Sequence, residues 1–164
     1  MTSSSTTERP DRIADRIREL GHELEVMPRP AGSYVPAKRA GDLVITSSIS
    51  AKRGTELRHV GQVGDVIGLA EARESAVLAV INCLTVLRAE LGSLERITDV
   101  VRLTGWVNSA PGFVDQHKVV DAASEFLVEL YGDAGRHARA ALGIAALPMN
   151  CSVGIELTVI APAE

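Results

Sequence analysis

Arg139 stands at the start of an apolar stretch, directly after a short segment that also contains Arg136 and His137. A buried guanidinium group is costly unless it is paired. Its planar fork can hold a carboxylate through two hydrogen bonds. Arg139 is therefore a candidate carboxylate-binding residue. The alternative is a structural ion pair with an aspartate or glutamate nearby.

Other polar side chains are weaker candidates. Glu156 lies inside the last apolar strand, where an acid either pairs with an arginine or has a function. His117 and His137, taken one by one, are more typical of surface or hydrogen-bonded residues than of catalysts. The Gly61-Gln-Val-Gly64 segment lacks the strand–turn–helix setting of a phosphate-binding loop and predicts a turn. No Cys/His spacing matches a zinc site, so neither a metal nor a cofactor is expected.

The composition narrows the class of protein. The chain has 164 residues, a net charge of −4 and 46% hydrophobic residues, which fits one globular domain with a substantial core. The acidic balance disfavours nucleic-acid binding. No stretch approaches the roughly 18 apolar residues of a membrane span, and the polar N-terminus lacks the apolar core of a signal peptide. A cytoplasmic protein that binds no membrane is expected.

The elements that must position these residues follow from periodicity. Helices are predicted at 11–24, 69–91 and 113–131, and strands at 34–39, 43–46, 97–107, 138–145 and 152–161. This order predicts an α+β fold with two long helices on one face of a mixed sheet. Several strands are apolar on both alternations, and no further helical layer is predicted. Another subunit is therefore expected to cover the second face of the sheet.

Four patterns, in order along the chain, resemble the RidA (YjgF) family, and especially its longer branch with an N-terminal helical extension. Gly32-Ser-Tyr and Gly41-Asp-Leu-Val-Ile-Thr-Ser are similar to the family's Gly-Pro-Tyr and Gly-Asn-x-x-x-Thr-Ser-Gly stretch. The other three are Asp99-Val-Val-Arg-Leu-Thr-Gly-Trp-Val-Asn, Ala138-Arg-Ala-Ala-Leu-Gly-Ile-Ala-Ala-Leu-Pro and Val153-Gly-Ile-Glu-Leu. The resemblance spans about residues 26–161. It divides the chain into a polar tail with a helical extension, 1–25, and a RidA-like domain, 26–164.

The resemblance implies a chorismate-mutase-like fold and a homotrimer with three clefts at the subunit interfaces, without a cofactor. For the deaminase branch it implies hydrolysis of enamine or imine intermediates to 2-keto acids and ammonia. The residue matching Arg139 would hold the carboxylate of the small metabolite that is the substrate. Tyr34 and Ser47 match substrate-binding positions that line the cleft, and His117 lies near a cleft-lining position that is usually Asn.

Two departures from the family pattern leave the reaction open. The family's Thr-Ser-Gly-Gln is Thr46-Ser-Ser-Ile here. Counting without gaps from Leu147-Pro, the acid that orients the attacking water falls on Gly154, whereas a loop longer by two residues would place it at Glu156. Two hypotheses follow: a deaminase that uses Arg139 and Glu156, or a trimer that binds small carboxylates without catalysis. A third, the endoribonuclease role attached to the family, fits the acidic charge poorly.

Overall fold

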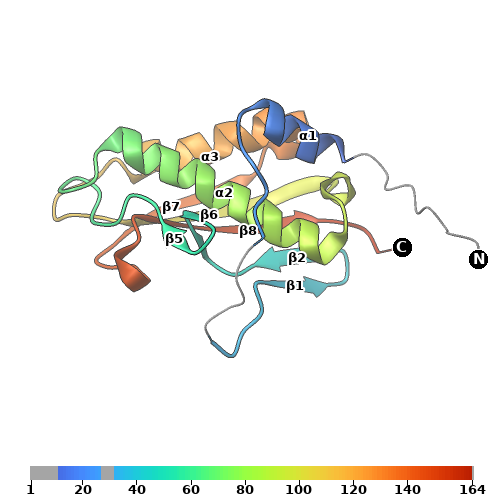
Figure 1. Ribbon diagram of the computed structural model, residues 1–164, viewed down its shortest axis with the longest axis horizontal. Coiled ribbons are helices and arrows are strands. Elements are labelled where there is room, and N and C mark those ends of the chain that lie inside the picture. Colours follow the sequence, from blue (N-terminus) through green and yellow to red (C-terminus); the bar gives the residue numbers. More distant parts are fainter. Residues whose placement is uncertain (1–10, 27–31, 164) are drawn as a thin grey trace, which may run out of the picture.

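Three α-helices lie on one face of a mixed β-sheet in the computed structural model, which describes residues 11–26 and 32–163 (Figure 1). The helices are α1 (Arg12–Glu19), α2 (Leu69–Leu91) and α3 (Gln116–Tyr131). The sheet has the order β1-β2-β8-β6-β7, and β3 also pairs with β8. Its strands are β1 (Ala37–Ala40), β2 (Leu43–Thr46), β3 (Ile49–Ser50), β6 (Asp99–Asn108), β7 (Ala138–Ile144) and β8 (Val153–Ile160). The predicted α+β fold is confirmed.

The elements outside this sheet are short. Strands β4 (Lys52–Arg53) and β5 (Glu56–Leu57) form a separate two-stranded hairpin. Three single turns of 3-10 helix, η1 (Leu94–Arg96), η2 (Gly132–Gly135) and η3 (Pro148–Asn150), connect the larger elements. The polar residues 1–10 of the predicted tail lie outside the described residues. No helix in the described part of the chain is long and apolar enough to cross a membrane.

The helix predicted at 69–91 is present with these same bounds, and the predicted hairpin is formed by β1 and β2. The first helix is shorter than predicted. Asp11 caps its N-terminus by accepting a hydrogen bond from the Ala14 amide, and it ends at Glu19 because Gly21 adopts a φ of +83°, outside the helical region. The third helix begins at Gln116 rather than 113, since Phe113 belongs to a turn in which its amide donates to the Ala110 carbonyl.

The main core lies between the helices and the sheet. Leu84 and Leu87 of α2 and Leu127 of α3 are fully buried, as are Leu103 of β6 and Leu157 of β8. Leu103 and Leu157 are register partners on adjacent strands, so their side chains share the face beneath the helices. Because side chains alternate along a strand, this register determines which face of the sheet the neighbouring side chains of β6 and β8 point toward.

The opposite face of the sheet carries no helix of the described chain (Figure 1). Leu43 and Ile45 alternate with the buried Val44 and Thr46 of β2, and Leu142 of β7 is opposite Trp106 on this same face; the three are 39%, 44% and 40% exposed. Exposed apolar side chains gathered on one face commonly mark a protein–protein interface. The structure thus leaves an apolar surface on the face where the sequence predicted contact with another subunit.

Candidate functional site

Arg139 points from β7 toward α3. In the parallel pairing of β6 and β7 it is opposite Leu103, on the helical face of the sheet. Its Nη1 donates one hydrogen bond to Asp121 Oδ1 at 3.0 Å and another to Ser124 Oγ at 3.1 Å. The side chain of Arg139 is 27% exposed and that of Asp121 is 52% exposed. The structural ion pair, which the sequence analysis gave as the alternative to carboxylate binding, is therefore present. It lies at an accessible edge of the molecule.

The remaining donors of the guanidinium group, Nε and Nη2, have no partner among the described residues. Arg139 lines a shallow groove of about 260 Å³ between α3 and β7. The groove is lined by Asp121, Ser124, Val128, Arg136, His137 and Arg139. A guanidinium with one free edge in an open groove is arranged to accept a second anion beside the one it already holds.

Asp121, Ser124 and Val128 of α3 form the helical wall of this groove. His117, Asp121 and Ser124 are spaced by four and three residues, so they lie on the same side of the helix, although His117 does not line the groove. This side adjoins the buried face that carries Phe126 and Leu127. His117 is exposed one turn before Asp121, so the structure puts it on the same stripe as the partners of Arg139.

His137 completes the groove and has a defined tautomer. Its Nδ1 lies 2.7 Å from the Gly135 carbonyl oxygen, which can only accept a hydrogen bond, so Nδ1 carries the proton. Nε2 is 3.0 Å from Ser124 Oγ and, in the neutral ring, accepts from that hydroxyl. Ser124 therefore accepts from Arg139 and donates to His137. Burial lowers the pKa of His137, and the charge of Arg139 lowers it further, so the neutral ring is favoured.

The lowered pKa of His137 predicts a pH-dependent stability. Because the folded protein binds this proton less tightly than the unfolded chain, the stabilisation is fully present above the unfolded pKa of about 6.5 and is lost as the pH falls through the folded value. We expect His137→Asn to reduce the loss of unfolding free energy between about pH 7.5 and about pH 5.5, measured by urea denaturation. His117→Asn, at an exposed position, is the control and should leave that loss unchanged.

Glu156 lies on the opposite face of the sheet from Arg139. It is the register partner of Thr104, one residue away from the pair formed by Leu103 and Leu157, so it points away from the helices. Its Oε1 accepts a hydrogen bond from the indole Nε1 of Trp106 at 3.0 Å. Within one chain, Glu156 and Arg139 are therefore separated by the sheet and cannot contact the same small molecule.

The remaining predicted residues lie near the other strands. Ser47 Oγ donates to the Val35 carbonyl at 2.7 Å, so Ser47 and Tyr34 belong to one local segment, in which Tyr34 is 57% exposed. A methyl group at Gly154 would come within 2.8 Å of Ser48 Oγ, which places the Ser47–Ser48 segment against β8. The candidate residues thus form two groups, one around Arg139 and His117 and one around Ser47 and Glu156.

The described residues offer neither a cluster of metal ligands nor a reactive thiol. Among the described residues, no group of three or more His, Cys, Asp or Glu side chains is placed to bind a metal ion. Burial raises the pKa of the Cys83 thiol to about 12, and burial also raises the pKa of Cys151. Neither cysteine is therefore a ready thiolate nucleophile.

The fold and sequence identify the class of this protein. Residues 14–159 match the YjgF/chorismate mutase-like, putative endoribonuclease family. The match extends over most of the chain, from α1 to β8. The protein belongs to this family, as the resemblance to RidA (YjgF) predicted.

Particular relatives share most of the chain. Protein TCP17 of Trypanosoma cruzi is 32% identical over 149 residues, which cover 90% of this chain and 93% of TCP17. The crystal structure of Atu1372 from Agrobacterium tumefaciens, described as having unknown function, is 38% identical and has a TM-score of 0.85, covering 92% of this chain and 94% of that one. TdcF from Escherichia coli, solved with bound serine, shares the fold at 20% identity and a TM-score of 0.60, covering 82% of this chain and 92% of its own.

Sequence reasoning selected Arg139 but missed its two partners on α3. Asp121 and Ser124 follow His117 at helical spacing, and this stripe would have indicated a polar wall facing the next strand. His137 was noted, but its bonds to Ser124 and Gly135 depend on the turn of η2, which no local pattern predicts.

Proposed function

We propose that this protein binds a small carboxylate-bearing metabolite on Arg139 and hydrolyses enamine or imine intermediates to 2-keto acids and ammonia, in clefts between the subunits of a homotrimer. The observation that carries the proposal is the free Nε and Nη2 edge of Arg139 in the groove between α3 and β7. Serine bound to TdcF, a protein of similar fold, shows that this fold can hold an amino acid. A carboxylate is the group of such a ligand that Arg139 suits.

The main contribution of the protein to this reaction would be to position the substrate. With its carboxylate on Arg139, a 2-imino acid presents the adjacent carbon to water. The water oxygen bonds to that carbon and one of the water protons passes to the nitrogen. The remaining hydroxyl proton then also passes to the nitrogen as the carbon–nitrogen bond breaks, which releases ammonia and leaves the keto group. Arg139 would hold the substrate in one orientation, and the hydrogen bonds that it donates to Ser124 and Asp121 would fix the guanidinium itself.

Glu156 would act from a neighbouring subunit. It lies on the sheet face that exposes Ile45 and Leu142, whereas Arg139 lies at the edge beside α3. If that face of one subunit packs against the edge of the next, Glu156 and the Tyr34–Ser47 segment approach the Arg139 groove of another copy. An acid at this place would orient the attacking water.

The reaction is tested with 2-aminoacrylate generated in situ. We expect the protein to accelerate the decay of 2-aminoacrylate and to yield pyruvate and ammonia in equal amounts, with Glu156→Gln slower than wild type. Equal decay with and without protein would contradict the deaminase proposal. Protein denatured by heat serves as the control for non-specific acceleration.

The trimer is tested separately. Light scattering should give a mass of three chains at micromolar concentration. Ile45→Glu should lower that mass, because it places a charge in the proposed interface. Ala89→Glu, which adds the same charge at an exposed position of α2 on the helical side of the sheet, is the control for the added charge alone. A monomer mass for the wild-type protein would contradict the trimer.

A trimer that binds carboxylates without catalysis is the second candidate. Two observations favour it: Glu156 is already engaged by the indole of Trp106, and the ungapped count places a glycine, Gly154, where the family acid stands. Binding of pyruvate that Arg139→Ala abolishes, without any acceleration of 2-aminoacrylate decay, would support this candidate.

The endoribonuclease role in the family description fits the net charge of −4 poorly, and RNA left intact at low salt would exclude it.

A further inference from the structure

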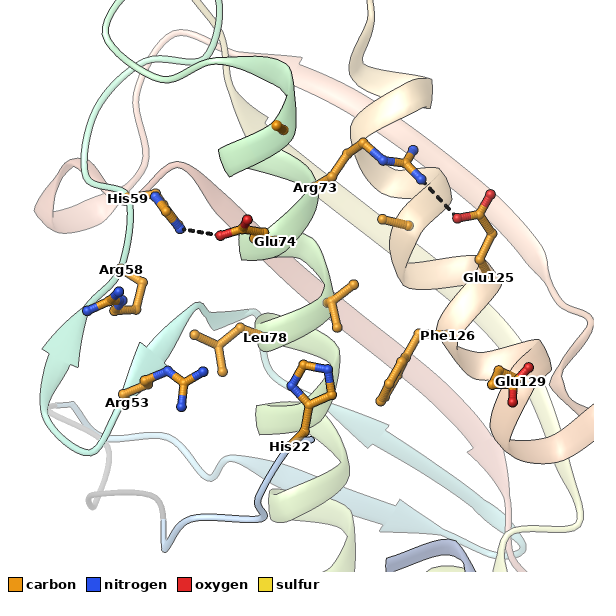
Figure 2. A pocket seen from close by; sticks show the side chains of 13 residues that line it. His22, Arg53, Arg58, His59, Arg73, Glu74, Leu78, Glu125, Phe126 and Glu129 are labelled. Atoms are coloured by element: carbon orange, nitrogen blue, oxygen red, sulfur yellow. Dashed lines mark hydrogen bonds and ion pairs between the residues drawn. The ribbon is translucent and has the colours of Figure 1, made fainter. Parts of the chain in front are cut away.

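The outer side of the helical layer holds a second and larger pocket, of about 790 Å³. It lies between α2 and α3 and is bordered by the segment after α1 and by the β4–β5 hairpin (Figure 2). On α3 it uses Ala122, Glu125, Phe126 and Glu129, whereas the Arg139 groove uses the stripe of Asp121 and Ser124. The two sites therefore open on different faces of the same helix. The volume is within the range of about 300–1,000 Å³ that is typical of small-molecule sites.

The floor of this outer pocket is apolar. Val77 and Leu78 of α2 are only partly buried, and Phe126 of α3 retains 8% exposure. The ring of His22 stands edge-on against Phe126, with ring centroids 5.5 Å apart and an interplanar angle of 89°. An aromatic or branched apolar group placed here would contact Leu78 and Phe126 and release water from them.

The acidic residues around the pocket already have partners. Glu125 pairs with Arg73 at 2.9 Å, and His59 Nε2 lies 3.2 Å from Glu74 Oε2. Glu129 pairs with Arg16, which lies outside the pocket. Two of these contacts are drawn as dashed lines in Figure 2. Each of these three carboxylates on the α2 and α3 walls therefore already has a basic partner.

Two arginines line the pocket on the side of the β4–β5 hairpin. Arg53 and Arg58 line the pocket and are exposed, and among the described residues no carboxylate forms an ion pair with either of them. Glu25, which is near the hairpin, accepts a hydrogen bond from the Gly54 amide instead. In Figure 2, Arg53 and Arg58 lie on the opposite side of Leu78 from Glu125 and Glu129. The pocket thus has one wall with unpartnered positive charge above an apolar floor.

His22 responds to this charge. Burial lowers its pKa, and the positive charge of Arg53 lowers it further. An anion bound beside Arg53 would reverse the second effect.

We propose that the outer pocket binds an amphipathic anion: a carboxylate held by Arg53 and Arg58, attached to a small aromatic or branched apolar body that lies on Leu78 and Phe126. This site is separate from the Arg139 groove and does not depend on the proposed deaminase activity.

The test uses 1-naphthoate as the probe and the full chain as the protein. We expect calorimetry to detect binding of 1-naphthoate, and the double variant Arg53→Ala/Arg58→Ala to weaken it at least about tenfold, because charge-assisted contacts are lost. Acetate, which lacks the apolar body, and 1-naphthalenemethanol, which lacks the charge, should each bind at least about tenfold more weakly. Arg18→Ala, at an exposed helical position outside the pocket, is the control for the loss of an arginine.

A second pair of variants tests the apolar part. Ala70→Trp places a large side chain at an exposed position on the pocket rim and should abolish binding, while Ala89→Trp, exposed near the other end of α2, should not. In the wild-type protein, 1-naphthoate should also raise the pKa of His22, as followed by NMR of the ring protons.

Three results would overturn the proposal. One is that 1-naphthoate does not bind, and another is that it binds equally well after removal of Arg53 and Arg58. The third is loss of binding in Arg139→Ala with binding retained in Ala70→Trp, which would assign the probe to the groove of the proposed function. Because the outer pocket is independent, binding there can be present whether or not 2-aminoacrylate is hydrolysed.

Discussion

Replacing Arg139 with alanine is expected to lower kcat/KM for 2-aminoacrylate by about a hundredfold while leaving the fold intact. A charge-assisted hydrogen bond contributes about 1.5–3 kcal/mol, and the loss of the guanidinium removes both orientation and charge at the substrate carboxylate. The ion pair with Asp121 is partly exposed, so its loss should cost less than about 1 kcal/mol of folding stability. The decay assay gives the first quantity and urea denaturation the second.

Two further substitutions define what Arg139 contributes. Arg139→Lys keeps the charge but loses the planar fork, so we expect activity between those of the wild type and the alanine variant. Arg136→Ala is the matched control. Arg136 lines the same groove but is paired with Asp133 and is 72% exposed, so its loss should change kcat/KM by less than about twofold.

Substitution of Asp121 distinguishes a substrate-binding role of Arg139 from a purely structural role. Asp121 accepts a hydrogen bond from Nη1 at 3.0 Å, and its negative charge partly offsets the positive charge that an incoming carboxylate would meet. Asp121→Asn removes that negative charge but keeps an oxygen that can accept the hydrogen bond, so it should lower KM several-fold. If Arg139 were only the partner of Asp121, both Arg139→Ala and Asp121→Asn would reduce stability slightly and leave the decay of 2-aminoacrylate unchanged.

The parts of the fold that the sequence predicted are those fixed by local periodicity. Helix α2 has no glycine or proline over its 23 residues and ends before Gly92, so its bounds could be predicted to the residue. The β1–β2 hairpin follows from a short turn between strand-forming segments. The segregation of helices and strands then sufficed for the α+β class.

The relation between Arg139 and Glu156 could not be predicted, because it depends on strand pairing across the sheet. Arg139 pairs with Leu103, and Leu103 pairs with Leu157 rather than with Glu156. A shift of one residue in either pairing would bring both side chains to the same face. No local pattern in the sequence specifies that register. The outer pocket was missed for a similar reason, since His22 and Arg53 meet only when the β4–β5 hairpin lies beside the helices.

The close packing of α3 on β6 is the second feature whose disruption should have a large effect on stability and activity. Gly105 of β6 lies directly under Val120 of α3, and a methyl group on Gly105 would come within 2.4 Å of Val120 Cγ2. Gly105→Ala must push the helix away or distort Val120, and overpacking of this kind costs about 1–3 kcal/mol of unfolding free energy. Val120 directly precedes Asp121, so the same shift should move the partner of Arg139 and lower activity along with stability.

A compensating substitution makes this prediction specific. Val120→Ala alone should destabilise the protein by about 2 kcal/mol through the cavity it leaves. In Gly105→Ala/Val120→Ala the new methyl group occupies part of that cavity. The double variant should therefore be at least about 1 kcal/mol more stable than the sum of the single effects predicts. Gly41→Ala, where the added methyl group meets no atom within 4 Å, is the control and should combine additively with Val120→Ala. Additive effects in the Gly105 pair as well would mean that α3 is not held at this distance by contact with β6, and that another feature positions Asp121 and Ser124 beside Arg139.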